Sequence, residues 1–340
     1  MIELALLTAL LNAPTTTPQA KLELTQLDVQ TEVDTEAELW PFEPVIEAQR
    51  SRLVETAVES TEAGTGDGSL LPTPPSLADI IQAQAAPETL NGFDTVLLTQ
   101  INALFGSENL PQANGGTVAP GLYVTISPQQ TLIFDEKIAD LQSGVIPPSA
   151  ASRECKSGCK AVLWAGFRRV WLAAVEEAER LALEVPVRVI FGAEASVPAK
   201  TLVELAYTAA ETRPGNPPSF SLLVNGGNAG LRARPFFILP PGGIRVSPGE
   251  NILGLRVTLG AGERFEISAA HPRFSPNVSG TGWKDLANQL AAIKKRYPNK
   301  GVLIIDVGDG TVNDVVMVML AGQKQFSNFV LTDGVPVKWG

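Results

Sequence analysis

The sequence predicts an α+β protein in which two β-β-α-β-α-β domains follow one another behind a largely extended, acidic N-terminal arm. Three observations support this fold class. The same order of apolar segments occurs twice between residues 119 and 340. Of the 340 residues, 44% are hydrophobic and 18% are charged, which is typical of folded chains. The charge is uneven, because residues 1–118 hold 17 acidic and 3 basic side chains.

Composition argues against several classes of function. The net charge of −10 is opposite to that expected of a nucleic-acid-binding protein. One histidine and two cysteines leave little material for a zinc cluster or a histidine-based triad. The chain has no apolar run of 18 residues, so we expect no membrane-spanning segment. We expect no cofactor and no enzymatic activity.

The N-terminal third is predicted to be an arm. Within residues 1–13, the apolar run from Leu4 to Leu11 has about the length of a signal-peptide core, although no basic residue precedes it. A signal, a truncated anchor and a short helix remain alternatives. Residues 14–75 form an acidic, Pro- and Thr-rich linker with too few apolar side chains to offset the entropy of ordering.

Residues 76–118 are predicted to contain amphipathic docking helices. Their apolar side chains recur at helical spacing, and Gly106 follows as a stop. The positions that define this stripe are Leu90, Phe93, Leu97, Ile101, Leu104 and Phe105. One interpretation is that the stripe docks a partner; the other is that it covers the core of the chain itself.

The first domain is predicted over residues 119–226. Alternating apolar residues predict a hairpin over 122–127 and 131–135. A stripe at i, i+3, i+4 spacing predicts a helix over 167–181. The remaining elements are a strand over 187–191, a helix over 197–210 and a strand over 220–225. An insertion between the hairpin and the first helix contains Cys155 and Cys159.

The second domain is predicted over residues 251–340 with the same order. Its elements are a hairpin over 255–259 and 264–268, a helix over 283–296, a strand over 302–307, a helix over 312–323 and a strand over 328–332. A shift of 115 aligns Val187 with Val302 and Ser196 with Thr311. Residues 227–250 connect the two domains, and their prolines and glycines predict little secondary structure.

The repeat resembles the periplasmic domain of the ExbD/TolR family of biopolymer-transport proteins. The segments GLYVTISPQQTLIFDEKI and VRVIFGAEASVPAKTLVELAYTAA carry the resemblance in the first copy. GLRVTLGAGERFEIS and GVLIIDVGDGTVNDVVMVMLAGQKQFSNFVLTDG carry it in the second. The resemblance implies a scaffold beside a proton-driven motor, with TonB-like or peptidoglycan partners. The family's membrane helix and its aspartate are not found here, so proton coupling is not carried over.

Two groups of residues suggest chemistry, each with an alternative. Cys155 and Cys159 are separated by three residues, so the sequence favours a structural disulfide over free thiols or a metal site. The acids between Asp306 and Asp314 suggest a metal site, but Thr311 and Asp314 also fit the spacing of a helix capping box. The capping box is the better interpretation.

The remaining polar and aromatic candidates are weaker. His271 has no organised catalytic partners and is predicted to be a loop residue. Trp164 is a candidate platform for a polymer, whereas Trp171 and Trp283 have the spacing of core residues. The arginines at 168, 169, 232, 234 and 245 either form basic spots for an anionic polymer or partner, or are solvated surface charges.

These observations predict a non-enzymatic periplasmic scaffold or adaptor in a cell-envelope complex. Open sheet edges are the expected contact surfaces, because an added strand satisfies their free backbone groups. The alternative is a peptidoglycan- or polymer-binding module. Two copies in one chain suggest a pseudo-dimer, with a homo-oligomer as the other option. The expected location is the periplasm or cell envelope, and the alternative is the cytoplasm.

Overall fold

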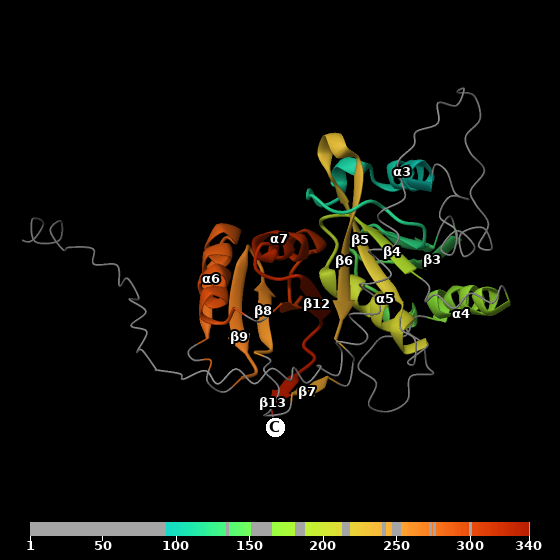
Figure 1. Cartoon of the computed structure of the whole chain (residues 1–340). Coiled ribbons are helices and arrows are strands. Elements are labelled where there is room, and N and C mark those ends of the chain that lie inside the picture. The colour runs from blue at the N-terminus through green and yellow to red at the C-terminus, as the bar shows by residue number, and fades with distance from the viewer. Residues whose placement is uncertain are drawn as a thin grey trace, which may run out of the picture. The chain divides into compact units, whose positions relative to one another are not determined.

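The computed structural model describes residues 93–133, 136–150, 165–180, 188–212, 218–239, 243–246, 253–271, 274, 277–298 and 301–339 (Figure 1). These residues all belong to one compact unit, Leu39–Gly340. The predicted signal, the linker and Leu90 lie outside the described residues, as does the insertion with Cys155 and Cys159. In the described part, the protein is a mixed α+β structure built around one large sheet.

The predicted elements of the first copy are present, with one strand added after the hairpin. In chain order they are β1 (Leu122–Ile126), β2 (Gln130–Ile133), β3 (Glu136–Asp140), α4 (Ala165–Arg180), β4 (Arg188–Ala193), α5 (Ala199–Thr212) and β5 (Ser219–Asn225). β1 pairs with β2 antiparallel and with β4 parallel, and β4 pairs with β5 parallel. Every residue of β4 is buried, which fits its nearly continuous β-forming sequence. Every residue of β1 is buried as well, although its sequence alternates between apolar and polar residues.

The second copy repeats this order, again with an added third strand. Its elements are β8 (Leu255–Gly260), β9 (Arg264–Ala269), β10 (Val278–Thr281), α6 (Trp283–Arg296), β11 (Val302–Asp306), α7 (Val312–Gly322) and β12 (Asn328–Thr332). A small separate pair joins β7 (Ile244–Val246) to β13 (Val337–Trp339). Figure 1 shows α6 and α7 beside β8, β9 and β12.

The two copies share one sheet of eleven strands rather than forming two sheets. The strand order is β10-β9-β8-β11-β12-β6-β5-β4-β1-β2-β3, so each copy occupies one half in the same internal order. The strand between them is β6 (Leu231–Ile238), which runs antiparallel to β5 and parallel to β12. The connector was predicted to have little secondary structure, and that prediction is wrong at β6.

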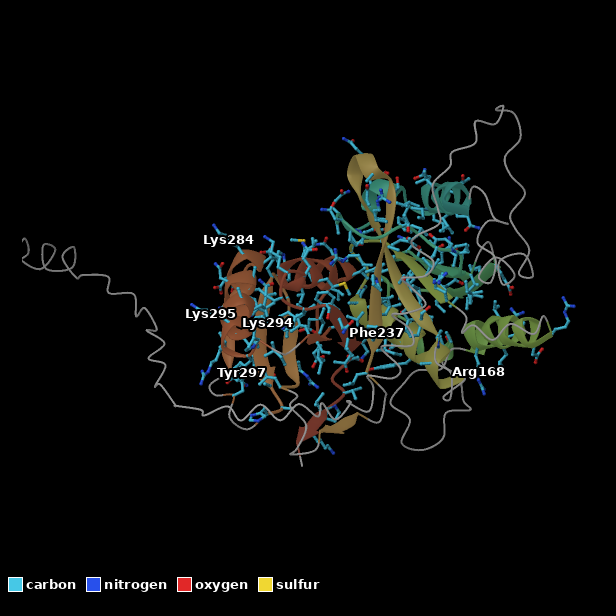
Figure 2. The ribbon with its side chains drawn as sticks, viewed as in Figure 1. Arg168, Phe237, Lys284, Lys294, Lys295 and Tyr297 are labelled. Carbon is cyan, nitrogen blue, oxygen red and sulfur yellow. The ribbon has the colours of Figure 1, made fainter. Side chains whose placement is uncertain are left out.

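Pro235 explains why the sequence did not predict β6, because proline is unusual within a strand. It also explains why the pairing along the outer edge of β6 is interrupted. The outer edge of β6 pairs with Gly116 through Ala233 and with β12 through Phe237. Pro235 lies between these two pairings, where its missing N–H leaves no donor toward a neighbour. Among the described strands, the two half-sheets therefore pair along the end of β6, near the labelled Phe237 in Figure 2.

Helices cover both faces of the first half-sheet: α4 and α5, the two helices predicted for this copy, pack on the same larger core, and α3 (Phe93–Leu104) covers the other face. Val124, Phe191 and Leu222 belong to the larger core, which α5 joins through Leu202 and Val203. The intervening strand residues Tyr123, Ile190 and Leu223 belong to a second core with α3. Figure 1 shows α3 and α4 on opposite sides of the strands between them. All positions of α5 from Thr201 to Ala209 are buried.

Candidate interaction surfaces

The apolar stripe of α3 faces the sheet of the chain itself. Leu97 and Ile101 are 1% and 0% exposed and pack with Tyr123, Ile190 and Leu223. Phe105 packs against this core while half-buried, and Leu104 is also half-buried. The side chain of Phe93 lies outside the described residues. For Leu97 and Ile101, the structure therefore favours the interpretation that the stripe covers the chain's own core.

The acidic stretch after β11 is a helix start, as the capping-box interpretation predicted. Thr311 caps α7, because its hydroxyl accepts from the Asp314 amide at 3.3 Å and its own amide donates to Asp314 Oδ2 at 2.8 Å. Asp309 is exposed, whereas Asp306 points to other partners. In the part of the chain that the structure describes, no three His, Cys, Asp or Glu side chains converge as metal ligands.

The other candidates occupy ordinary positions. His271 lies in a loop, where its amide donates to the Leu253 carbonyl at 3.2 Å. Trp283 is partly buried against the larger core, as its spacing predicted. Trp164 lies outside the described residues. None of the described helices has both the length and the apolar stretch that crossing a membrane requires.

The β10 edge of the sheet is regular and uncharged. Four consecutive residues of β10 pair with β9 without a register shift. The Gly282 amide donates to the Glu263 carbonyl at 3.0 Å, so Gly282 and Glu263 continue the same register as a hydrogen-bonded pair. Because hydrogen-bonded and non-bonded pairs alternate in an antiparallel ladder, the amides and carbonyls of Ser279 and Thr281 point away from β9. Both residues are exposed, so the β10 edge offers backbone donors and acceptors to another strand.

The opposite edge, β3, is blunted in three ways. Its pairing with β2 contains a register shift beside Thr131 and Leu132, which is a bulge. Exposed Lys137 and Asp140 form an ion pair along it at 2.9 Å. A β-carbon at Gly166 of α4 would lie 3.1 Å from the Ile138 carbonyl oxygen, so α4 begins directly against this strand. Bulges and charges are common protections of edge strands, which makes β10 the more accessible edge.

The surface of α6 beside β10 carries several cations. Lys284 and Lys295 are exposed, and Figure 2 shows them directed away from the ribbon. Lys294 lies instead over the ring of Phe326, with Nζ 5.6 Å from the ring centroid. The clustering at the end of α6 also complements the negative end of the helix dipole. Among the predicted basic spots on the first copy, Arg169 pairs with Glu136.

A polar cluster joins the two copies where α5 meets the end of β12. Lys200 Nζ lies 3.4 Å from Asp333 Oδ2, and Tyr207 Oη lies 3.4 Å from Thr332 Oγ1. In each pair the first residue belongs to α5 of the first copy and the second follows or ends β12 of the second. Burial raises the pKa of Tyr207. The cluster thus attaches a helix of one copy to a strand of the other.

The chain after β12 is fixed by the same cluster. The Gly334 amide donates to Asp306 Oδ1 at 3.0 Å, and the Val335 amide donates to Thr332 Oγ1 at 3.1 Å. Asp306 also pairs with Arg256 at 3.3 Å, and the two side chains are 10% and 18% exposed. Asp306 therefore holds a turn in place, and its partners account for its position without a ligand.

Glu204 lies within this junction and was not singled out by the sequence. It occupies the middle of α5 and is 9% exposed. Burial raises its pKa to about 7, with Lys200 lowering and Asp333 raising the value. No hydrogen bond or ion pair involves its carboxylate among the described residues. Glu204 differs from the surface glutamates because the surrounding part of α5 is buried on every side. That burial depends on tertiary packing, so the sequence carries no signal for it.

Comparisons with protein-family models, with curated proteins and with solved structures found no match for this chain. The resemblance to the ExbD/TolR family therefore stays a prediction from the sequence pattern.

Proposed function

We propose that the chain is a non-enzymatic scaffold or adaptor that binds an extended segment of a partner protein along β10. The observation that carries the proposal is the outward direction of the Ser279 and Thr281 backbone groups on a regular, uncharged edge. An added strand satisfies these groups and extends the sheet. The small, exposed side chains of Ser279 and Thr281 leave room for a partner's side chains on one face, whereas Asp285 and Phe265 cover the other face at Gly280.

The proposed setting is a periplasmic or other cell-envelope complex, near a membrane motor or a TonB-like protein. This setting rests on the resemblance of the repeat.

Strand addition is tested with a proline at an outward-facing position. Ser279→Pro removes the outward amide and places a ring against an incoming strand, whereas Ser279→Ala keeps the backbone donor. Tagged full-length chains are crosslinked in cells, and partners are quantified by mass spectrometry. We expect one partner to be retained by Ser279→Ala and lost by Ser279→Pro. Equal recovery with both variants, at equal folded content, would reject β10 as the binding edge.

A further inference from the structure

Arg234 on β6 is a buried arginine with no acidic partner in the part of the chain that the structure describes. Its side chain is 8% exposed. This burial does not fit a solvated surface charge, which was one of the two interpretations of the arginines in the sequence. No carboxylate lies within ion-pair distance of it among the described residues. Burial lowers its pKa, which reflects the cost of keeping a charge away from water. Buried charges are normally paired, so this position is incomplete as a purely structural site.

The hydrogen bonds of Arg234 leave part of its guanidinium available. Its Nη1 donates to the Asn114 carbonyl at 2.6 Å. Both Nη1 and Nη2 face Gln323 Oε1, at 3.4 and 3.5 Å, which is the outer limit of a hydrogen bond. Its Nε–H makes no hydrogen bond with a described residue. The neutral amide oxygen of an exposed side chain thus occupies a position that suits an anionic oxygen.

A second arginine lies on the same side of the strand. Arg232 and Arg234 alternate with Ala233, so their side chains leave β6 on one face, about 7 Å apart. Arg232 is half-exposed and has no hydrogen bond or ion pair among the described residues. Exposed Lys324 follows Gln323 at the end of α7 and adds a third positive charge to the surroundings.

Two glycines bring a neighbouring segment against this pair. A β-carbon at Gly115 would lie 2.7 Å from the Ala233 carbonyl oxygen and 3.1 Å from Arg232 Cβ, so a larger residue does not fit there without movement. Gly116 exchanges hydrogen bonds with Ala233 at 2.9 Å in both directions. These contacts hold the Asn114 carbonyl beside Arg234, which fixes the orientation of the guanidinium.

We propose that Arg234 and Arg232 form a binding site for an oxyanion, a carboxylate or a phosphate group, at the junction of the two half-sheets. The planar guanidinium matches the paired oxygens of either group. Gln323 turns outward when the anion binds, since its two contacts are long and its side chain is exposed. The site is independent of the β10 edge, so it stands or falls separately from the proposed function.

The site is tested by calorimetric titration of the full-length chain with inorganic phosphate and, separately, with succinate, at constant ionic strength set with chloride. Saturable binding of phosphate alone identifies a phosphate ligand, and binding of succinate identifies a carboxylate, such as an acidic group of a partner. We expect Arg232→Gln and Arg234→Gln each to weaken binding at least tenfold. The matched control is Arg264→Gln, an exposed arginine of β9, which should leave binding unchanged.

A third variant keeps the test decisive if Arg234→Gln does not fold. Gln323→Glu places a carboxylate of the chain itself at the Gln323 side chain, whose Oε1 lies 3.4 and 3.5 Å from Nη1 and Nη2 of Arg234. It should raise the melting temperature and abolish the binding of the added anion, because the site is then occupied. Absence of binding by both anions to the unaltered chain overturns the proposal. So does binding that survives Gln323→Glu and Arg232→Gln.

Discussion

The Val312 amide donates a hydrogen bond to the Val197 carbonyl over 2.9 Å, and these two valines occupy equivalent positions in the two copies of the repeat. The same loops are joined by Ala199 to Gly310 at 2.9 Å and by Asn313 to Ala195 at 3.1 Å. Loops that follow equivalent strands thus bind each other, as they do across the two-fold axis of a homodimer. This contact supports the hypothesis of a pseudo-dimer within one chain.

The contribution of the hydrogen bond between the Val312 amide and the Val197 carbonyl can be tested by substituting proline for Val312. Val312 is the first residue of α7 after the cap Thr311, a position where proline suits a helix. Thr311 is already extended, with φ −90° and ψ 170°, as a residue before proline must be. Val312→Pro should therefore keep α7 and lose the bond to Val197, lowering the free energy of unfolding in urea by about 1 kcal/mol beyond Val312→Ala.

The alanine variant is the control for this comparison. Val312 is fully buried, so Val312→Ala measures the loss of side-chain packing while the amide stays in place. Equal stability of the two variants would mean that the bond between the copies contributes nothing. A loss of far-ultraviolet helix signal in Val312→Pro alone would instead show that α7 does not accept proline.

The cap of α7 is the next prediction. Thr311→Ala removes the hydroxyl that accepts from Asp314 and leaves the Asp314 carboxylate with fewer donors. We expect a loss of about 1 kcal/mol in the free energy of unfolding. Thr281→Ala on the exposed end of β10 is the matched control and should change stability by less than half as much. Similar losses from both changes would contradict the role of the cap.

Much of the fold could be predicted because, in each copy, segments with the apolar pattern of a strand and segments with the apolar spacing of a helix follow one another. The capping box at Thr311 and the helices at 283–296 and 312–323 were readable from spacing and end signals alone. The third strand of each copy was missed. β10 has four residues with only one large apolar side chain, Val278, and β3 reads as the polar segment Glu136–Asp140. Edge strands bury little, so their patterns are weak.

The surfaces depended on tertiary contacts that spacing does not encode. Whether the α3 stripe is free or buried is decided by Tyr123 and Ile190, which face it from strands far along the chain. Arg234 is buried because Asn114 and Gln323 cover it, from segments 120 and 89 residues away in sequence. No local pattern distinguishes Arg234 from Arg232. The resemblance could suggest a scaffold, but it could not identify which edge is open.

A close contact beneath α3 gives a further prediction. A β-carbon at Gly192 would clash with Tyr123 Oη, so Gly192→Ala forces the ring to move. We expect a loss of about 1–3 kcal/mol in the free energy of unfolding. The Tyr123 hydroxyl is buried without a hydrogen-bond partner in the described part, so Tyr123→Phe alone should be neutral or stabilising.

The double variant identifies the hydroxyl as the cause of the clash. Tyr123→Phe in the Gly192→Ala background removes the closest atom, and we expect it to restore part of the lost stability. The measurement is a double-mutant cycle by urea unfolding. Strict additivity of the two changes would show that the alanine acts on something other than the tyrosine hydroxyl.

Glu204 predicts how stability changes with pH. Burial disfavours the carboxylate and raises the pKa of Glu204 in the folded chain from its ordinary value of 4.5 to about 7. Between these two values the folded chain keeps a proton that the unfolded chain has lost, so stability falls as pH rises through this window. The loss is at most about 3 kcal/mol and is complete above the folded pKa. Below about pH 4 the contribution is fully present.

Glu204→Gln should remove this part of the pH dependence, because the amide stays neutral in both states. The measurement is the free energy of unfolding from pH 4.5 to 8 for the unaltered chain, Glu204→Gln and the exposed control Glu266→Gln. The variant's profile should be flatter than that of the other two, and its stability should exceed theirs most at pH 8. Because the charge of Lys200 lowers the pKa of Glu204, the effect should grow when Lys200→Met removes that charge. Parallel profiles for all variants would place the titration elsewhere in the chain.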